Sequence, residues 1–297
     1  MEIRKVAVIG YPVKHSLSPK LHGYWLDFYK DELAVKGVKG EYGMLEVKPE
    51  DLEKTLLGLK DNGYVGCNIT VPHKERAFEI VSKFGSIDNT AKLIGAVNTI
   101  AVINGKLFGT NTDAYGFIEN IKSYYSNFKF SSGRSVVLGA GGAARAVIYG
   151  LANSGVERVI ITNRTASKAE ELKILADDIS KLKLAKNIKI EAKVIDWEKK
   201  ENILDNANIL VNTTSLGMTG QPDLDINLDK LPKDALVTDI VYKPLETTLL
   251  KNARNHGNKV VDGLGMLLYQ AQGGFELWFG IKPEVTEELR KHILSGI

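Results

Sequence analysis

The residues Val136-Val137-Leu138-Gly139-Ala140-Gly141-Gly142-Ala143-Ala144 join a short β-branched run to a glycine-rich turn. Their GxGxxA pattern is typical of the first strand-to-helix turn of a dinucleotide-binding fold. Gly139 permits the tight turn, Gly141 lets a pyrophosphate approach the backbone, and Ala144 allows close helix–strand packing. A glycine-rich turn without a ligand is the alternative reading. Because strand patterns lie on both sides, we expect a dinucleotide site at this turn.

Strand patterns continue beyond this turn and predict a doubly wound parallel sheet, because helical segments separate them. The runs are Ser135 to Leu138, Arg158 to Thr162, Ile188 to Val194, Ile209 to Asn212, Ala235 to Val241 and Lys259 to Val261. The first third predicts strands at Lys5 to Ile9, Tyr42 to Val47 and Cys67 to Thr70, and helices at Pro19 to Lys30 and Pro49 to Asp61. Asn104-Gly105 predicts a hairpin turn between Val97 to Ile103 and Lys106 to Phe108. The fold class expected is α/β.

The chain has 297 residues, a length that favours two domains. We expect a substrate-binding and catalytic domain at 1–113 and a Rossmann-type dinucleotide-binding domain at 114–263. The apolar segment Leu264 to Phe279 predicts a helix, and we expect residues 264–297 to return to the first domain. Ser123 to Gly133 is the candidate linker because it is polar and precedes a strand.

The composition excludes several classes of protein. Hydrophobic residues are 44% and charged residues 25%, which is typical of globular domains. A net charge of +3 argues against a nucleic-acid partner, and the lysines between Lys181 and Lys193 are expected to form a solvated face. No apolar run is long enough to cross a membrane, and the single Cys67 forms no internal disulfide. We expect a cytoplasmic monomer or homodimer that acts on a small molecule.

The residues that follow the second strand of the sheet indicate which dinucleotide binds. Asn163 stands where an NAD-binding fold usually has a carboxylate, and Arg164 comes next. The planar, permanently charged guanidinium matches a phosphate, so the sequence favours NADP over NAD. The alternative is a solvated arginine at a strand end.

Four polar clusters in the first third have no evident packing purpose. Ser16 and Ser18 precede a proline-started helix and are suited to bind a carboxylate, although Ser18 also fits an ordinary helix cap. Asn68 and Thr70 are expected on one face of a strand. Asn98 and Asp113 lie in the third and fourth clusters, on either side of the predicted hairpin.

Lys74 is expected in the first turn of a helix, where a cation is electrostatically unfavourable. A surface lysine is the alternative for Lys74, and a helix cap is the alternative for Asp113. As partners, the carboxylate would hold the ammonium and tune its proton exchange, as general acid–base catalysis requires.

These motifs together resemble the shikimate dehydrogenase family, and the resemblance covers nearly the whole chain. Its markers are Ser16-Leu17-Ser18-Pro19, Asn68-Ile69-Thr70-Val71-Pro72-His73-Lys74, Gly95-Ala96-Val97-Asn98-Thr99, Asn111-Thr112-Asp113, Gly139 to Arg145, Asn163-Arg164-Thr165, Asn212-Thr213-Thr214-Ser215, Asp239-Ile240-Val241-Tyr242 and Gly263-Leu264-Gly265-Met266-Leu267 leading to Gln270. The resemblance implies NADP-dependent, reversible reduction of 3-dehydroshikimate to shikimate, in aromatic amino-acid biosynthesis.

The resemblance also implies roles for individual residues. Lys74 and Asp113 match the catalytic pair. The substrate-binding positions matched are Ser16, Ser18, Asn68, Thr70, Asn98, Tyr242 and Gln270. The cofactor-binding positions matched are Gly139, Ala140, Gly141, Gly142, Ala143, Asn163, Arg164, Thr165, Ser167, Lys168, Ile240 and Gly263.

Two other functions stay open, a quinate/shikimate dehydrogenase of broader substrate and cofactor use and a non-catalytic dinucleotide-binding regulator. No metal site is expected, because His15, His22 and His73 come from different elements and no carboxylate or thiolate joins them at useful spacing. His73 stands where the family commonly has an apolar or aromatic residue, and we assign it no chemistry.

Overall fold

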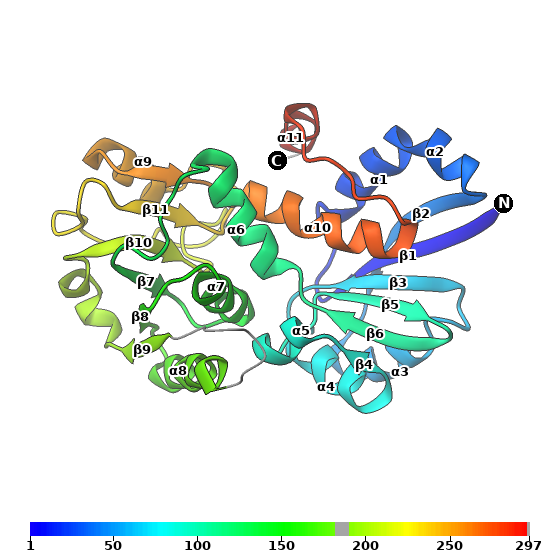
Figure 1. The fold of residues 1–297 in the computed structure, drawn as a ribbon, viewed down its shortest axis with the longest axis horizontal. Coiled ribbons are helices and arrows are strands. Elements are labelled where there is room, and N and C mark those ends of the chain that lie inside the picture. Colours follow the sequence, from blue (N-terminus) through cyan, green and yellow to red (C-terminus); the bar gives the residue numbers. More distant parts are fainter. Residues whose placement is uncertain (182–189, 296–297) are drawn as a thin grey trace. The chain divides into compact units, whose positions relative to one another are not determined.

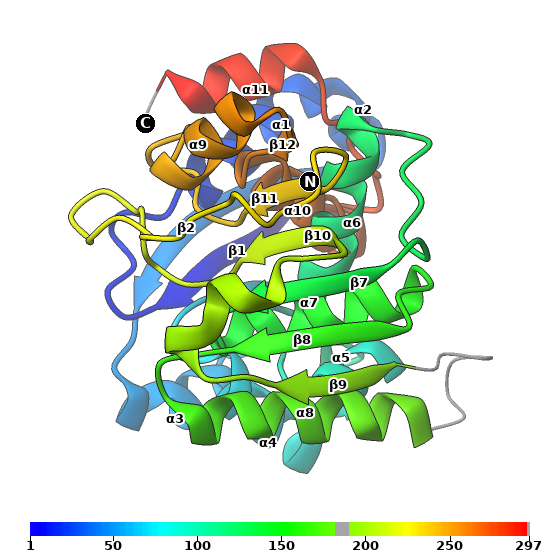
Figure 2. The ribbon, with the colours of Figure 1, turned by 90° about the vertical axis from the view of Figure 1, so that its left-hand side faces the viewer.

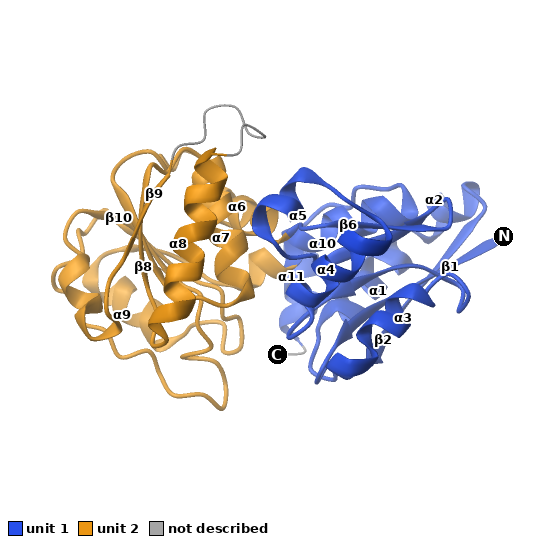
Figure 3. Ribbon diagram, turned by 90° about the horizontal axis from the view of Figure 1, so that it is seen from below, with its two compact units in different colours: residues 1–112, 268–297 blue, residues 113–267 orange. Residues whose placement is uncertain are grey.

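The computed structural model describes residues 1–181 and 190–295. Its chain divides into two compact units (Figure 1). Unit 1 comprises residues 1–112 and 268–297, and unit 2 comprises residues 113–267 (Figure 3). The expected boundaries were 113/114 and 263/264. In the structure Asp113 already belongs to unit 2, and the chain returns to unit 1 at residue 268, four residues later than expected. That second boundary falls inside a helix, which sequence patterns of strands and loops do not reveal.

Unit 1 holds a sheet with helices on both faces. Its strands are β1 (Glu2–Gly10), β2 (Val38–Glu46), β3 (Tyr64–Ile69), β4 (Ser86–Ile87), β5 (Thr99–Ile103) and β6 (Lys106–Thr110). Its helices are α1 (Ser18–Phe28), α2 (Lys30–Val35), the 3-10 helix η1 (Pro49–Asp51), α3 (Leu52–Leu57), α4 (Lys74–Phe84), α5 (Asn89–Ile94) and α11 (Glu287–Leu294). Helix α10 (Leu264–Phe279) begins in unit 2 and continues in unit 1.

The strands of unit 1 run in the order β2-β1-β3-β5-β6-β4. β1 pairs in parallel with β2 and β3, whereas β5 is antiparallel to both β3 and β6. Asn104 and Gly105 both have positive φ, as a two-residue hairpin turn requires, which confirms the predicted hairpin. The pairing places residue 68 opposite residue 99, and residue 99 opposite residue 110, so three of the four polar clusters share one region of the sheet.

Each face of this sheet has its own apolar cover. Residues of α3, α4 and α5, among them Leu56, Ile80 and Ala91, pack with the strand residues Ile9 and Ile69. α1 buries positions 18, 21, 22 and 25, the spacing of one helical face. An aromatic cluster joins α1 to α10 through Trp25 and Phe275. The sheet is therefore covered by local helices on one side and by helices from both ends of the chain on the other.

Unit 2 contains the predicted parallel sheet. Its elements are α6 (Asp113–Tyr124), β7 (Arg134–Leu138), α7 (Gly142–Asn153), β8 (Arg158–Thr162), α8 (Ala166–Lys181), β9 (Glu191–Val194), the 3-10 helix η2 (Trp197–Ile203), β10 (Ala207–Asn212), β11 (Leu236–Asp239), α9 (Thr248–His256) and β12 (Lys259–Val261). All five strand pairs are parallel, in the order β12-β11-β10-β7-β8-β9 (Figure 2). This is the 3-2-1-4-5-6 order of the doubly wound fold, so the predicted fold class is confirmed.

Several local predictions were wrong in detail. The helix expected at Pro49 to Asp61 consists of η1 and the short α3, and β4 and α5 were not predicted. The candidate linker Ser123 to Gly133 lies within unit 2, between α6 and β7. Ile188, the expected start of the third strand, and Lys183, Lys186 and Lys189 of the lysine run fall outside the described residues. None of the helices in residues 1–181 and 190–295 has the length and apolar character of a membrane span.

Candidate functional site

A polar network in unit 1 is centred on the side chain of Asn98. Its Nδ2 donates hydrogen bonds to Oγ1 of Thr112 at 2.9 Å and to Oε1 of Gln270 at 3.2 Å. Its Oδ1 accepts from the backbone N–H of Thr112 at 2.9 Å and from Oγ1 of Thr99 at 3.0 Å. Asn98 and Gln270, both predicted site residues, are buried and directly bonded. Such a satisfied buried network holds its members in one geometry.

Asn68 is the second centre of this network. Its Nδ2 donates to the carbonyl oxygen of Asn98 and to Oγ1 of Thr99, both at 3.2 Å. Its Oδ1 accepts a hydrogen bond of 2.6 Å from the hydroxyl of Tyr42 on β2. Removal from water raises the pKa of Tyr42 well above 10, so the phenol stays protonated and acts as a donor.

The serine cluster lies at the start of α1. Oγ of Ser16 accepts from the backbone N–H of Ser18 at 3.3 Å, and the helix begins at Ser18 with Leu17 as its N-cap. The alternative of Ser18 as a helix cap is therefore wrong, because the hydroxyl that meets a free N–H is that of Ser16. Both serines keep a place at a helix N-terminus, where free N–H groups favour an anion.

Thr70 directly follows β3. Its backbone N–H donates to the carbonyl oxygen of Ile9 at 2.8 Å, and its own carbonyl accepts from His73 at 2.9 Å. These bonds fix the turn that leads from β3 into α4. The turn thereby connects Thr70 with Lys74, the first residue of α4.

Lys74 is partly exposed and begins α4, as the sequence predicts. Its carbonyl oxygen accepts from the backbone N–H of Val97 at 2.9 Å, which ties the lysine to the loop that carries Asn98. A chemical role for its ammonium stays a prediction.

Two predicted residues of the same group lie in unit 2. Asp113 is buried and is the first residue of α6, so the helix does not begin at Ala114 as the cap interpretation required. The carboxylate in the first turn is favoured by the helix dipole. Tyr242 lies after β11, and burial raises its pKa.

The glycine-rich turn of unit 2 has the geometry that its sequence predicts. Gly139 has a φ of +105° and follows β7, and Gly141 is the N-cap of α7. A Cβ on Gly139 would lie 2.7 Å from Oγ1 of Thr213, whereas a Cβ on Gly141 would meet no atom within 4 Å. Ala144, in the first turn of α7, is fully buried. The open space above Gly141, next to the N–H groups of α7, fits a pyrophosphate.

The loops after the neighbouring strands lie along the same edge of the sheet. Asn163 follows β8, and its Nδ2 donates to the carbonyl oxygen of Thr165 at 2.9 Å. Arg164 is exposed, and Ser167 and Lys168 lie in the first turn of α8. The positive side chain of Arg164 is therefore accessible to a phosphate group.

Ile240 and Gly263 come together within unit 2. A Cβ on Gly263 would lie 2.3 Å from the carbonyl oxygen of Ile240, so only glycine fits this approach. Asp239 anchors the loop, because it accepts from the N–H of Val241 at 2.9 Å and from Thr247 at 2.8 Å. Burial raises the pKa of Asp239 to about 6.

The histidines and the cysteine do not form a second centre. His22 and His73 are buried, and Nε2 of His73 lies 2.7 Å from the carbonyl oxygen of Val47. Cys67 is buried in β3, and burial raises the pKa of its thiol. Within the described part of the chain, no group of three or more His, Cys, Asp or Glu side chains is arranged to hold a metal ion.

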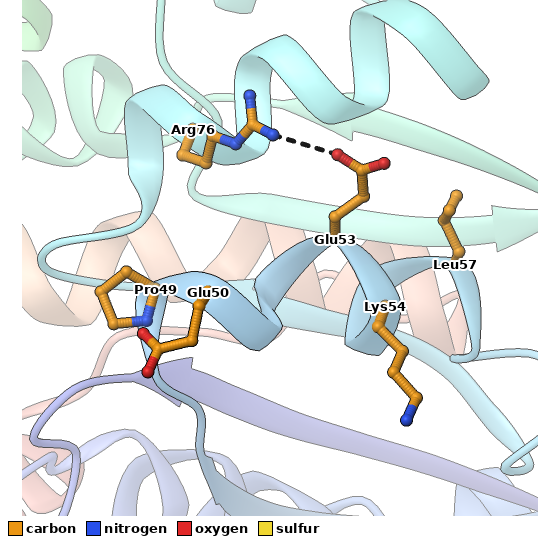
Figure 4. A pocket seen from close by; sticks show the side chains of 6 residues that line it. All are labelled: Pro49, Glu50, Glu53, Lys54, Leu57 and Arg76. Carbon is orange, nitrogen blue, oxygen red and sulfur yellow. Dashed lines mark hydrogen bonds and ion pairs between the residues drawn. The ribbon is translucent and has the colours of Figure 1, made fainter.

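A surface hollow of about 590 Å³ lies elsewhere in unit 1 (Figure 4). Its lining residues are Pro49, Glu50, Glu53, Lys54, Leu57 and Arg76. Arg76 pairs with Glu53 at 3.0 Å and with Glu79 at 2.6 Å, so its charge is already neutralised. None of the predicted site residues lines this hollow.

Three members of the network were not predicted as site residues. Thr99 and Thr112 stand inside the quoted motifs, and their hydroxyls bond Asn98. Tyr42 reaches Asn68 from β2, 26 residues earlier, and nothing in its local sequence indicates this. Its role depends on the pairing of β1 with both β2 and β3.

Comparison with known proteins covers both units. The model of the shikimate dehydrogenase substrate binding domain matches residues 8–100, the shikimate / quinate 5-dehydrogenase model matches 122–219, and the shikimate 5'-dehydrogenase C-terminal domain model matches 263–293. A Brucella abortus relative, named shikimate dehydrogenase (NADP(+)), is 45% identical over 297 residues, with 99% of this chain and 95% of the relative covered.

Two solved structures extend this comparison. Shikimate 5-dehydrogenase from Thermus thermophilus, in complex with NADP(H) and shikimate, superposes with a TM-score of 0.80 at 33% identity, covering 99% of this chain and 100% of the other. Quinate dehydrogenase from Corynebacterium glutamicum, in complex with NAD, gives a TM-score of 0.84 at 28% identity, covering 98% and 99%. The chain therefore belongs to the shikimate dehydrogenase family of NADP-dependent oxidoreductases.

Proposed function

We propose that this chain catalyses the reversible, NADP-dependent reduction of 3-dehydroshikimate to shikimate, with Lys74 and Asp113 as the proton-exchanging pair. The observation that carries the proposal is the single hydrogen-bonded network of Asn68, Asn98 and Gln270 in unit 1. Lys74 is tied to the same loop through Val97. The polyhydroxylated ring and carboxylate of shikimate suit such a set of amides and hydroxyls.

The cofactor proposal rests on the carboxyl edge of the parallel sheet in unit 2. Gly139 to Ala143 would hold the pyrophosphate, because the Cβ position of Gly141 is open and the N–H groups of α7 begin there. Arg164 would bind the adenosine 2′-phosphate, supported by Asn163, Thr165, Ser167 and Lys168. Ile240 and Gly263 would form the surface next to the nicotinamide. When bound, NADPH supplies the hydride that the ring carbonyl carbon receives.

The chain itself supplies the proton for the substrate oxygen and positions the group that transfers it. As the carbonyl carbon is reduced, its oxygen gains negative charge and must be protonated. The Lys74 ammonium bonds this oxygen, stabilises the developing alkoxide and delivers the proton. Asp113 is the proposed partner that orients the ammonium. In the reverse direction, Lys74 takes the hydroxyl proton as hydride leaves the carbon.

The remaining substrate contacts are proposed for the positions that the family resemblance matches. Ser16 and Ser18 bind the substrate carboxylate at the start of α1, away from the reacting oxygen, without a competing cation. Asn68, Thr70, Asn98, Tyr242 and Gln270 bind ring hydroxyl groups. Because of these roles, removal of one of these side chains should raise the KM for shikimate and leave the KM for NADP nearly unchanged.

One spectrophotometric assay tests the proposal. Absorbance at 340 nm is followed with shikimate or quinate, each combined with NADP or NAD. We expect the highest kcat/KM for shikimate with NADP. The quinate dehydrogenase structure with bound NAD makes the broader enzyme the second candidate, and comparable rates with quinate and NAD would establish it instead. Absence of turnover in all four combinations would favour the non-catalytic regulator.

We also propose that the chain acts in the cytoplasm as a monomer or homodimer. The only cysteine is buried, so the fold does not rely on a disulfide. Size-exclusion chromatography with light scattering distinguishes the two oligomeric states.

A further inference from the structure

The orientation of the Asn68 amide is set by three protein groups. Tyr42 donates to its Oδ1 at 2.6 Å, and its Nδ2 donates to the carbonyl oxygen of Asn98 and to Oγ1 of Thr99 at 3.2 Å each. Asn68 is only 5% exposed. Both amide hydrogens and one of the two oxygen lone pairs are thus used within the protein.

The reverse orientation of this amide is excluded by the acceptors around it. A flipped Asn68 would place its oxygen against the carbonyl oxygen of Asn98, which has no hydrogen to donate. Thr99 already donates its hydroxyl hydrogen to Oδ1 of Asn98 at 3.0 Å, so it too meets Asn68 as an acceptor. A flip would therefore leave buried polar atoms unpaired.

Tyr42 is itself held firmly in place. The His22 ring stacks on it with a centroid separation of 4.1 Å and an interplanar angle of 7°, and Trp278 lies at 6.2 Å on a tilted plane. The His22 ring thus gives Tyr42 an aromatic packing surface.

We infer that Tyr42 is a positioning residue that fixes the polarity of Asn68, so that Asn68 meets the substrate only through Oδ1, as the acceptor of a hydrogen bond from one ring hydroxyl. This inference rests on the proposed function, which makes Asn68 a substrate contact. It adds a selection rule: the ring position that faces Asn68 must carry a hydrogen-bond donor. A keto or ether oxygen at that position is disfavoured, because it would face a second acceptor.

The test combines removal of the Tyr42 hydroxyl with removal of substrate hydroxyls. Wild type and Tyr42→Phe are assayed for NADP-linked oxidation of shikimate and of two analogues, each lacking one of the two non-reacting ring hydroxyls. With shikimate, we expect kcat/KM to fall about 2- to 13-fold, the range for loss of one neutral hydrogen bond. The KM for NADP should stay within about twofold of wild type.

The analogues separate positioning from general damage. For the analogue without the hydroxyl that faces Asn68, the penalty of Tyr42→Phe should shrink below about twofold, while it persists for the other analogue. Equal penalties for all three substrates, or no penalty with shikimate, would overturn the inference. Failure of wild type to oxidise shikimate would instead overturn the proposed function.

A control variant and a second assay distinguish the inference from general damage to the fold. Tyr24→Phe is the matched control, because Tyr24 of α1 stacks on Phe28 and lies outside the network of Asn68 and Asn98. It should leave all three substrates unaffected. If Tyr42→Phe does not fold, wild type is assayed with an analogue that carries an ether oxygen, an acceptor without a hydrogen, at the ring position that faces Asn68. Its kcat/KM should be lower than that of the analogue without any oxygen at this position, and an equal or higher value would count against the inference.

Discussion

The side-chain amide of Asn98 donates a hydrogen bond of 3.2 Å to Oε1 of Gln270, which lies 172 residues further along the chain. This bond joins the loop before β5 to α10, the helix that leads the chain back from unit 2. Unit 1 is thus completed only when the C-terminal segment has packed against its sheet.

Gln270 and Gln272 provide a matched pair on α10. Gln270→Leu should lower kcat/KM for shikimate by about 10-fold or more, because it removes a partner of Asn98 from the proposed substrate site. Gln272 donates to the carbonyl oxygen of Pro283 at 2.7 Å. Gln272→Leu should therefore lower the free energy of unfolding by about 1–3 kcal/mol and leave the shikimate KM near wild type. Steady-state kinetics and urea unfolding check both, and matching activity losses would refute the distinction.

Gly141 and Gly139 should respond differently to the same added methyl group. Gly141→Ala should change the free energy of unfolding by no more than about 0.5 kcal/mol, because its Cβ meets open space and its φ of −92° suits alanine. Its NADP affinity should fall, because the methyl group enters the proposed pyrophosphate site. Gly139→Ala should destabilise the fold, because its φ is +105°. The NADP affinity is measured by calorimetric titration. An affinity of Gly141→Ala equal to that of wild type would contradict the proposed site.

Arg164 should determine the preference for NADP over NAD. Arg164→Ala loses a charged hydrogen bond of about 1.5–3 kcal/mol, so the ratio of kcat/KM for NADP to that for NAD should fall about 10- to 150-fold. Arg158→Ala is the control, because Arg158 is also exposed but begins β8, whereas Arg164 follows its end. An unchanged ratio in Arg164→Ala would remove this residue from the 2′-phosphate site.

Lys74 and Asp113 should act as one proton-exchanging unit, so that loss of either side chain lowers kcat. Lys74→Ala should lower kcat by about 10² to 10⁴, the usual cost of losing a general acid–base group, while NADP binding stays near wild type. Asp113→Asn should also lose activity. The double variant should be far less impaired than the product of the two single defects. A fully multiplicative double variant would indicate independent roles, and a normal kcat in Lys74→Ala would end the catalytic assignment.

His22 should make the fold sensitive to acid. Burial lowers the pKa of His22 to about 3, from 6.5 in an unfolded chain. Between these values the unfolded chain binds a proton that the folded chain does not, so stability falls as the pH falls from 6.5 towards 3. At pH 4 the loss is on the order of 3 kcal/mol.

The variant His22→Phe removes this ionisation and both buried nitrogens. We expect its free energy of unfolding at pH 7 to equal or exceed that of wild type, and its decline from pH 7 to pH 4 to be shallower. Urea unfolding at a series of pH values measures both. An identical pH dependence in the two proteins would show that His22 does not contribute.

The elements that could be predicted correctly are those whose signals are local. Helix α10 has the bounds predicted for it, and all six strands of the unit 2 sheet were expected, with small differences at their ends. The turn at Gly139 was also predictable from its glycine pattern. The pattern is informative because the positive φ of Gly139 and its close approach to Thr213 require glycine. Such features depend on periodicity and backbone conformation within a few residues.

Contacts between residues far apart in the sequence depend on long-range packing. Tyr42 reaches Asn68 only because β1 pairs with β2 on one side and with β3 on the other, and no local pattern specifies that strand order. The same holds for Thr99 and Gln270, whose bonds to Asn98 require an antiparallel neighbour strand and a returning helix. Residue types fixed the available chemistry, whereas long-range packing selected the partner and orientation of each polar group.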